Sequence, residues 1–139
     1  PIKSSAASDV YKRQEQLRLI HRHKTGALIN AAIQMGGAAA QADEVQCKAL
    51  EAYAYGIGLV FQVVDDVLDV AGTAEQLGKP IGSDSENGKT TFATLFGVDG
   101  AMQLAEKLND ETCTALRDAF GEKSAFLEQL ARTLLNRRS

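Results

Sequence analysis

The chain has 139 residues, of which 45% are hydrophobic and 24% are charged, and its formal net charge is −3. The length allows one domain or part of one, the composition excludes a globally disordered chain, and the acidic balance argues against a general nucleic-acid binder. With 2 prolines, no tryptophan and abundant alanine, the sequence favours helices over a β-sandwich or barrel. Cys47 and Cys113 match neither a zinc spacing nor a disulfide framework, so we expect a reducing, cytoplasmic setting.

The first residues, 1–14, show neither a helical nor a strand period, and they lack the apolar core of a signal peptide. Their run KSSAASDVYKRQ is similar to the translated read of a sequencing-library adapter. We therefore expect 1–14 to be a non-native or disordered, adapter-like tail, and we assign 15–139 to one domain.

After this tail, nearly every segment is predicted to be helical, which makes the chain all-α. A short polar helix, Glu15–His23, precedes an alanine- and glycine-rich helix, Lys24–Ala40, in which apolar residues recur at helical spacing. Asp43 is expected to cap the next helix together with Gln46. That helix should end near Val70.

A glycine-rich segment, Gly72–Lys89, is predicted to be a long loop, and loops of this length are usually functional or disordered. A short turn at Thr91–Phe96 should lead into a helix from Asp99 to Phe120, which Gly121 ends. The last helix is expected from residue 122 to about residue 137. The sequence thus predicts about five helices.

The helix segment from Tyr55 to Asp69 is apolar except for one acidic sector. At about 100° per residue, Asp65, Asp66 and Asp69 lie in the same sector of the helix as Gln62. The surrounding apolar stretch, 52–71, is long enough to cross a bilayer. Its three aspartates make such a membrane span very costly, so we expect none.

The three aspartates repel one another, and they lie at the end of the helix that disfavours anions. A solvated face would mix charges of both signs, but no basic residue occurs between Glu51 and Gly78. A divalent cation would remove the repulsion, and oxygen-only ligands suit Mg²⁺, Mn²⁺ or Ca²⁺. Because Mg²⁺ usually binds one or two carboxylates plus substrate phosphates, the pattern predicts a metal-bridged phosphate site at the mouth of a helical bundle.

Lysines in glycine-containing segments could reach such a phosphate. They are Lys24 in KTG, Lys79 in GKP and Lys89 in GKTT, and none of these segments matches the P-loop pattern. His21 and His23 are predicted to be a polar helix end and not a metal site, because residues i and i+2 do not share a helix face.

Together these motifs resemble those of the trans-polyprenyl diphosphate synthases, the farnesyl and geranylgeranyl diphosphate synthase family, and in particular its bacterial short-chain members. FQVVDDVLD at 61–69 is similar to the family's second aspartate-rich motif, and HRHKTGAL at 21–28 to its K-T motif. LGKPIGSD at 77–84, followed by NGKTT at 87–91, resembles its LGK…GxD…GKxT segment. Phe92-Ala93 stands where many members have Tyr-Pro.

The resemblance implies the class I isoprenoid synthase helical bundle. The family's first aspartate-rich motif does not occur in this sequence, so the resemblance also implies a C-terminal fragment with the N-terminal helices missing. Catalysis needs metal held from two sides, and we therefore expect the fragment alone to be inactive. The family further implies a homodimer at full length, and the segment 130–138 favours a farnesyl-type enzyme.

The implied reaction is the head-to-tail, trans condensation of an allylic diphosphate with isopentenyl diphosphate, which yields a short-chain polyprenyl diphosphate. By motif, Asp65, Asp66 and Asp69 would hold Mg²⁺. Lys24, Lys79 and Lys89 would bind the diphosphate. Thr25 and Gln62 would bind substrate and stabilise the allylic cation.

Three alternatives stay open. Another class I terpenoid synthase, such as a cyclase, would share the cation chemistry but is not expected to carry the K-T and LGK…GKxT motifs. A non-catalytic regulatory subunit of a heteromeric synthase would be expected to lose aspartates that are intact here. A helical interaction module would need none of these motifs.

Overall fold

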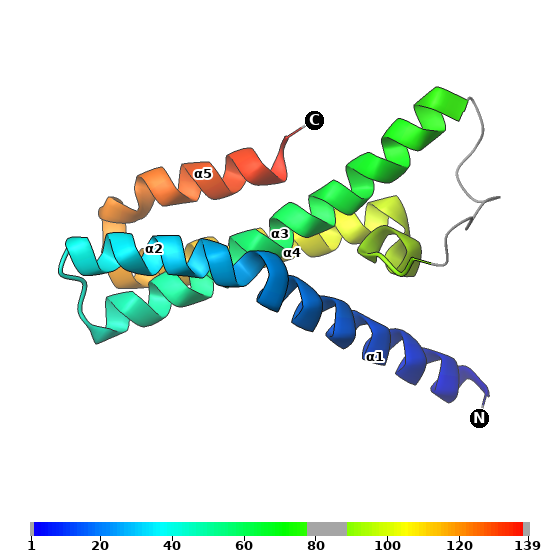
Figure 1. Ribbon diagram of the computed structural model, residues 1–139, viewed down its shortest axis with the longest axis horizontal. Coiled ribbons are helices and arrows are strands. Elements are labelled where there is room, and N and C mark those ends of the chain that lie inside the picture. Colours follow the sequence, from blue (N-terminus) through cyan, green and yellow to red (C-terminus); the bar gives the residue numbers. More distant parts are fainter. Residues whose placement is uncertain (1, 78–88, 138–139) are drawn as a thin grey trace.

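The computed structural model describes residues 2–77 and 89–137, which are almost entirely helical (Figure 1). This part of the chain contains no strand, which confirms the all-α prediction. No helix in it is long and apolar enough to cross a membrane. The elements in chain order are α1 (Ile2–His21), the π-helical segment η1 (Arg22–Gly26), α2 (Ala27–Ala39), α3 (Glu44–Leu77), α4 (Phe92–Phe120), the 3₁₀ turn η2 (Gly121–Ser124) and α5 (Ala125–Leu135).

The central helix of the bundle is α3, which packs along α4 and also contacts α2, α5 and η1. Figure 1 shows α2 beside the N-terminal half of α3, whereas α1 projects away from the bundle. Burial of apolar side chains between α3 and α4 is the main stabilising contribution. One core cluster surrounds Val60, Val63 and Phe92. A second surrounds Tyr53 and Leu116.

Several predicted helix ends are confirmed. The backbone N–H of Gln46 donates to Asp43 Oδ1 at 2.9 Å, and the N–H of Asp43 donates to Gln46 Oε1 at 3.0 Å. Gly121, with φ 57°, ends α4. Gly97, with φ 72°, kinks α4 after its first turn, so the predicted turn and the helix that follows are two parts of one element.

The structure makes α1 longer than predicted. Residues 2–14 are helical, whereas we expected a tail without regular structure. No glycine or proline interrupts Ile2–His21, and a helix extends readily once its first turn has formed. The side chains of 6–13 are exposed. The adapter-like origin of 1–14 stays a prediction.

α3 also extends beyond its predicted end and continues through Gly72 to Leu77. Gly72 has no neighbour within 4 Å that a Cβ would meet, so its cost to the helix is only that of its low propensity. The rest of the predicted loop, residues 78–88, lies outside the described residues, and Lys79 lies there with it.

Candidate functional site

The K-T segment forms η1, one π-helical turn between α1 and α2. Such turns are rare and occur often at functional sites. Gly26 and Gly58 allow η1 to approach α3 closely. A Cβ on Gly26 would lie 2.8 Å from Cδ1 of Tyr55, and one on Gly58 would lie 3.4 Å from the Gly26 Cα. Since Gly58 shares a helix face with Asp65, η1 contacts α3 on the acidic side.

Asp66 on α3 is half-buried, and its side chain reaches the start of α4. Its Oδ2 accepts a hydrogen bond from the backbone N–H of Phe92 at 3.0 Å, and a helix N-terminus favours a negative charge. Burial raises the pKa of Asp66, although the Phe92 N–H and His21 oppose this effect. This contact links the three aspartates of α3 (Asp65, Asp66 and Asp69, here called the acidic motif) to the first turn of α4.

His21 is the last residue of α1, as predicted, but its side chain is half-buried. Its ring stacks on Phe92 with the ring centroids 5.8 Å apart. Both ring nitrogens are buried and lack a hydrogen-bond partner among the described residues. Burial lowers the pKa of His21, Asp66 opposes the shift, and Lys24 and Lys89 add to it. Asp66 and two predicted diphosphate ligands, Lys24 and Lys89, therefore all influence the pKa of this imidazole.

The spacing of the two histidines does not show which of them faces the core, so the burial of His21 was not predicted. His23 is exposed, as the predicted polar helix end implied. In the sequence, the indication that His21 is buried would have been Leu17, four residues earlier, which lies in the same core cluster as Phe92.

Asp65 forms an ion pair that the spacing of the motifs did not predict. Arg137, which follows α5, donates from Nη2 to Asp65 Oδ1. The same Nη2 lies 3.2 Å from the backbone oxygen of Phe61, and the guanidinium lies over the Phe61 ring at 3.9 Å from its centroid. The acidic motif therefore contacts the end of α5 as well as the start of α4.

The other predicted site residues lie on the same elements. Gln62 and Thr25 are half-buried, on α3 and η1 respectively. Lys24, Lys89 and Asp69 are exposed. The structure thus places carboxylates on α3 beside cationic segments at η1 and before α4. An arrangement of this kind can bind an anion together with a divalent metal.

The donor set of α3 fits Mg²⁺ that is shared with a phosphate. In the described part of the chain, no three acidic, histidine or cysteine side chains converge into a closed metal site. Mg²⁺ seldom needs one, because it keeps waters and takes one or two carboxylates plus phosphate oxygens. Carboxylates at positions i, i+1 and i+4 of one helix match this need.

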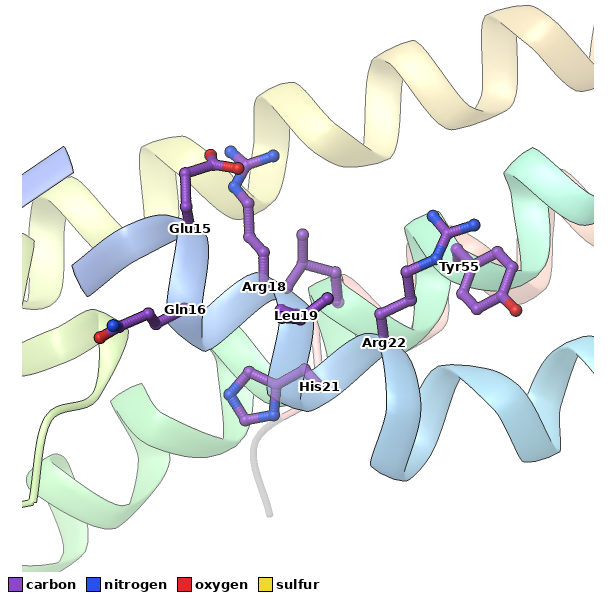
Figure 2. A pocket seen from close by; sticks show the side chains of 8 residues that line it. Glu15, Gln16, Arg18, Leu19, His21, Arg22 and Tyr55 are labelled. Carbon is purple, nitrogen blue, oxygen red and sulfur yellow. The ribbon is translucent and has the colours of Figure 1, made fainter. Parts of the chain in front are cut away.

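A cavity of about 500 Å³ is lined by α1, η1 and α3, on the N-terminal side of the acidic motif (Figure 2). Arg22 covers the ring of Tyr55 at 3.9 Å from its centroid. Leu19 and Leu59 add apolar surface. The cavity is bounded by α1 and α3 next to the K-T segment. The three aspartates are not among its lining residues.

These elements define an all-α protein in which the acidic side of α3 lies against the basic, glycine-containing segment η1. The family model for Polyprenyl synthetase matches residues 3–130 of the chain. The chain therefore belongs to the polyprenyl synthetase family, as the three sequence motifs predicted.

Relatives of this family align over most of the chain. Over 125 residues, 90% of the chain, it is 43% identical to a geranylgeranyl pyrophosphate synthase 10, mitochondrial, of Arabidopsis thaliana, and covers 36% of that protein. It is 41% identical over 123 residues to a geranylgeranyl diphosphate synthase of Cyanophora paradoxa, covering 88% of the chain and 41% of the relative.

A solved structure shows the same fold. The crystal structure of a protein from Marinomonas sp. MED121, designated a farnesyl-diphosphate synthase, superposes with a TM-score of 0.69 at 35% identity. The match covers 88% of this chain and 40% of that one. The chain thus spans well under half the length of the relatives it matches.

Proposed function

We propose that the chain is the C-terminal part of a prenyltransferase that condenses an allylic diphosphate with isopentenyl diphosphate. The observation that carries this proposal is the close approach of η1 to α3 at Gly26 and Gly58, which brings the segment with Lys24 to the acidic side of the helix. The names of the relatives support a short-chain polyprenyl diphosphate as the product.

Each site residue has a role in this proposal. Asp65, Asp66 and Asp69 would hold Mg²⁺, which when bound neutralises the charge that develops on the leaving diphosphate. Lys24 and Lys89 would bring positive charge to the diphosphate oxygens, and we assign the same role to Lys79 by its motif. The side-chain oxygens of Thr25 and Gln62 would stabilise the allylic cation.

An acidic motif on a single helix can hold a metal from one side only. We therefore propose that the active enzyme, here called the complete synthase, joins this chain to an N-terminal region with a second acidic motif. We also propose that the complete synthase is a cytoplasmic homodimer, and the two free thiols, Cys47 and Cys113, are compatible with a reducing compartment.

The product length in this proposal is broader than the sequence indicated. The C-terminal segment favoured a farnesyl-type enzyme, but the relatives described above are geranylgeranyl synthases, and only the solved structure is designated farnesyl. We propose a short-chain product of either length.

Incubation of the complete synthase with Mg²⁺, labelled isopentenyl diphosphate and dimethylallyl, geranyl or farnesyl diphosphate tests the proposal. Chromatography with mass spectrometry should detect a longer prenyl diphosphate, and its mass gives the product length. The 139-residue chain alone should yield none. A complete synthase that gives no product from any of the three substrates would contradict the proposed function. An active isolated chain would contradict the proposal that a second acidic motif is needed to hold the metal.

A further inference from the structure

Three contacts hold the Arg137 side chain at the acidic motif, and only one of them involves a carboxylate. Its guanidinium stacks on the Phe61 ring and donates to the Phe61 backbone oxygen. The third contact is the ion pair with Asp65 Oδ1. The Arg137 side chain is only 19% exposed, whereas that of Asp65 is 46% exposed. The Arg137 side chain can therefore keep its two contacts with Phe61 while the Asp65 carboxylate binds another partner.

The ion pair occupies an oxygen that a metal would need. A guanidinium N–H uses the lone pairs of the carboxylate, and a divalent cation coordinates through those same lone pairs. Without a metal, the neighbouring aspartates repel one another, and the charge of Arg137 reduces that repulsion. The two cations therefore compete for Asp65.

We infer that Arg137 stays ion-paired with Asp65 when no metal is bound and releases this carboxylate when metal binds together with diphosphate. The inference rests on the proposed function, because it takes Asp65 as a metal ligand. Arg137 weakens the binding of metal alone, since a metal at Asp65 must displace the guanidinium and then lies close to its positive charge. A diphosphate supplies negative charge that offsets this repulsion, so Arg137 strengthens the coupling between metal and diphosphate.

Metal binding to the complete synthase tests this competition. Mn²⁺ serves as the probe, its bound fraction is measured by electron paramagnetic resonance, and the titration is repeated with inorganic pyrophosphate. Arg137→Ala should tighten the binding of Mn²⁺ alone by about two- to five-fold, the range expected for a half-exposed ion pair. With pyrophosphate the change should be smaller, so the gain in metal affinity that pyrophosphate produces should shrink in the variant.

Arg132→Ala is the matched control. This variant also removes one positive charge, but from Arg132 on α5, which is 64% exposed and whose Nη2 lies 3.8 Å from Glu128 Oε2. Its metal affinity should not change. Arg137→Lys, which keeps the charge but loses the planar fork, should show a smaller tightening, and it carries the test if Arg137→Ala fails to fold.

Unchanged or weaker binding of Mn²⁺ alone in Arg137→Ala would overturn the inference. Asp65→Ala separates this failure from a failure of the proposed function. If Asp65→Ala binds Mn²⁺ with pyrophosphate as tightly as the unmodified synthase does, the metal site itself is wrong, whatever Arg137 does.

Discussion

Asp66 is a residue of the acidic motif whose charge is opposed by burial. Burial raises its pKa above the ordinary value of 3.8. The stability linked to this group is therefore present below that ordinary value and is lost as the pH rises through the raised pKa. At neutral pH the charged carboxylate lowers the stability of the metal-free protein, which is common for groups retained for function.

Asp66→Asn should therefore stabilise the metal-free complete synthase. Asparagine keeps an oxygen that can accept the Phe92 N–H and removes the buried charge. We expect a gain of roughly 0.5–1 kcal/mol at pH 7, which should shrink as the pH falls through the raised pKa of Asp66. Urea unfolding with a chelator present measures both values.

Asp110→Asn, at an exposed position of α4, is the control for this experiment. It should change the free energy of unfolding by less than about 0.5 kcal/mol. A metal-free Asp66→Asn protein that is less stable than the unmodified synthase at pH 7 would show that the carboxylate is structural.

At the scale of elements, close contact between α3 and α4 depends on Gly56. A Cβ at this position would lie 2.1 Å from Oγ1 of Thr112, whose side chain is buried on α4. Because a β-branched side chain has few rotamers in a helix, the two helices would have to separate to admit the extra methyl group.

Gly56→Ala should therefore destabilise the complete synthase by about 1–3 kcal/mol in urea unfolding. The matched change, Gly36→Ala on α2, meets nothing within 4 Å. It should stabilise the protein by up to ~1 kcal/mol through helix propensity. Equal effects from the two substitutions would mean that α3 and α4 are not packed at Gly56.

The elements that the sequence predicted well have signals within a few residues. The capping pair of Asp43 and Gln46 and the stop at Gly121 are local, so pattern and propensity found them. The start of α1 and the end of α3 were not predicted, because a polar composition at 2–14 and a glycine at 72 are weak signals for a helix. Neither prevents a helix when no side chain competes for the space.

The contacts of the candidate site residues were not predictable from the sequence. Motif spacing proposes the acidic motif and its lysines as site residues, and that assignment stays a prediction. The ion pair between Arg137 and Asp65 joins residues 72 positions apart, and the stacking of His21 on Phe92 joins two different helices. Both depend on how α5 and α1 pack on α3 and α4, which no periodicity encodes.

At the scale of the whole molecule, large apolar side chains lie at the surface of the described structure. Leu28 and Met35 on α2 are 76% and 72% exposed, and Leu19 and Ile20 on α1 are 57% and 55% exposed. Figure 1 shows α1 projecting away from the other helices. Exposed large apolar side chains on neighbouring segments favour association when they form a patch.

The 139-residue chain alone should therefore self-associate or form a molten state. Size-exclusion chromatography with light scattering should give a mass above that of a monomer or a broad distribution, whereas the complete synthase should elute as one discrete species. A monomeric chain that unfolds cooperatively in urea would show that the exposed side chains need no partner.

The turnover number of Asp65→Ala in the complete synthase tests the central claim most directly. The claim is that the acidic face of α3 holds the metal that assists departure of the diphosphate. With Mg²⁺ and both diphosphate substrates saturating, kcat should fall by several orders of magnitude, while Asp110→Ala keeps it unchanged and circular dichroism shows the same helix content in both. Turnover near that of the unmodified synthase in Asp65→Ala would contradict the account.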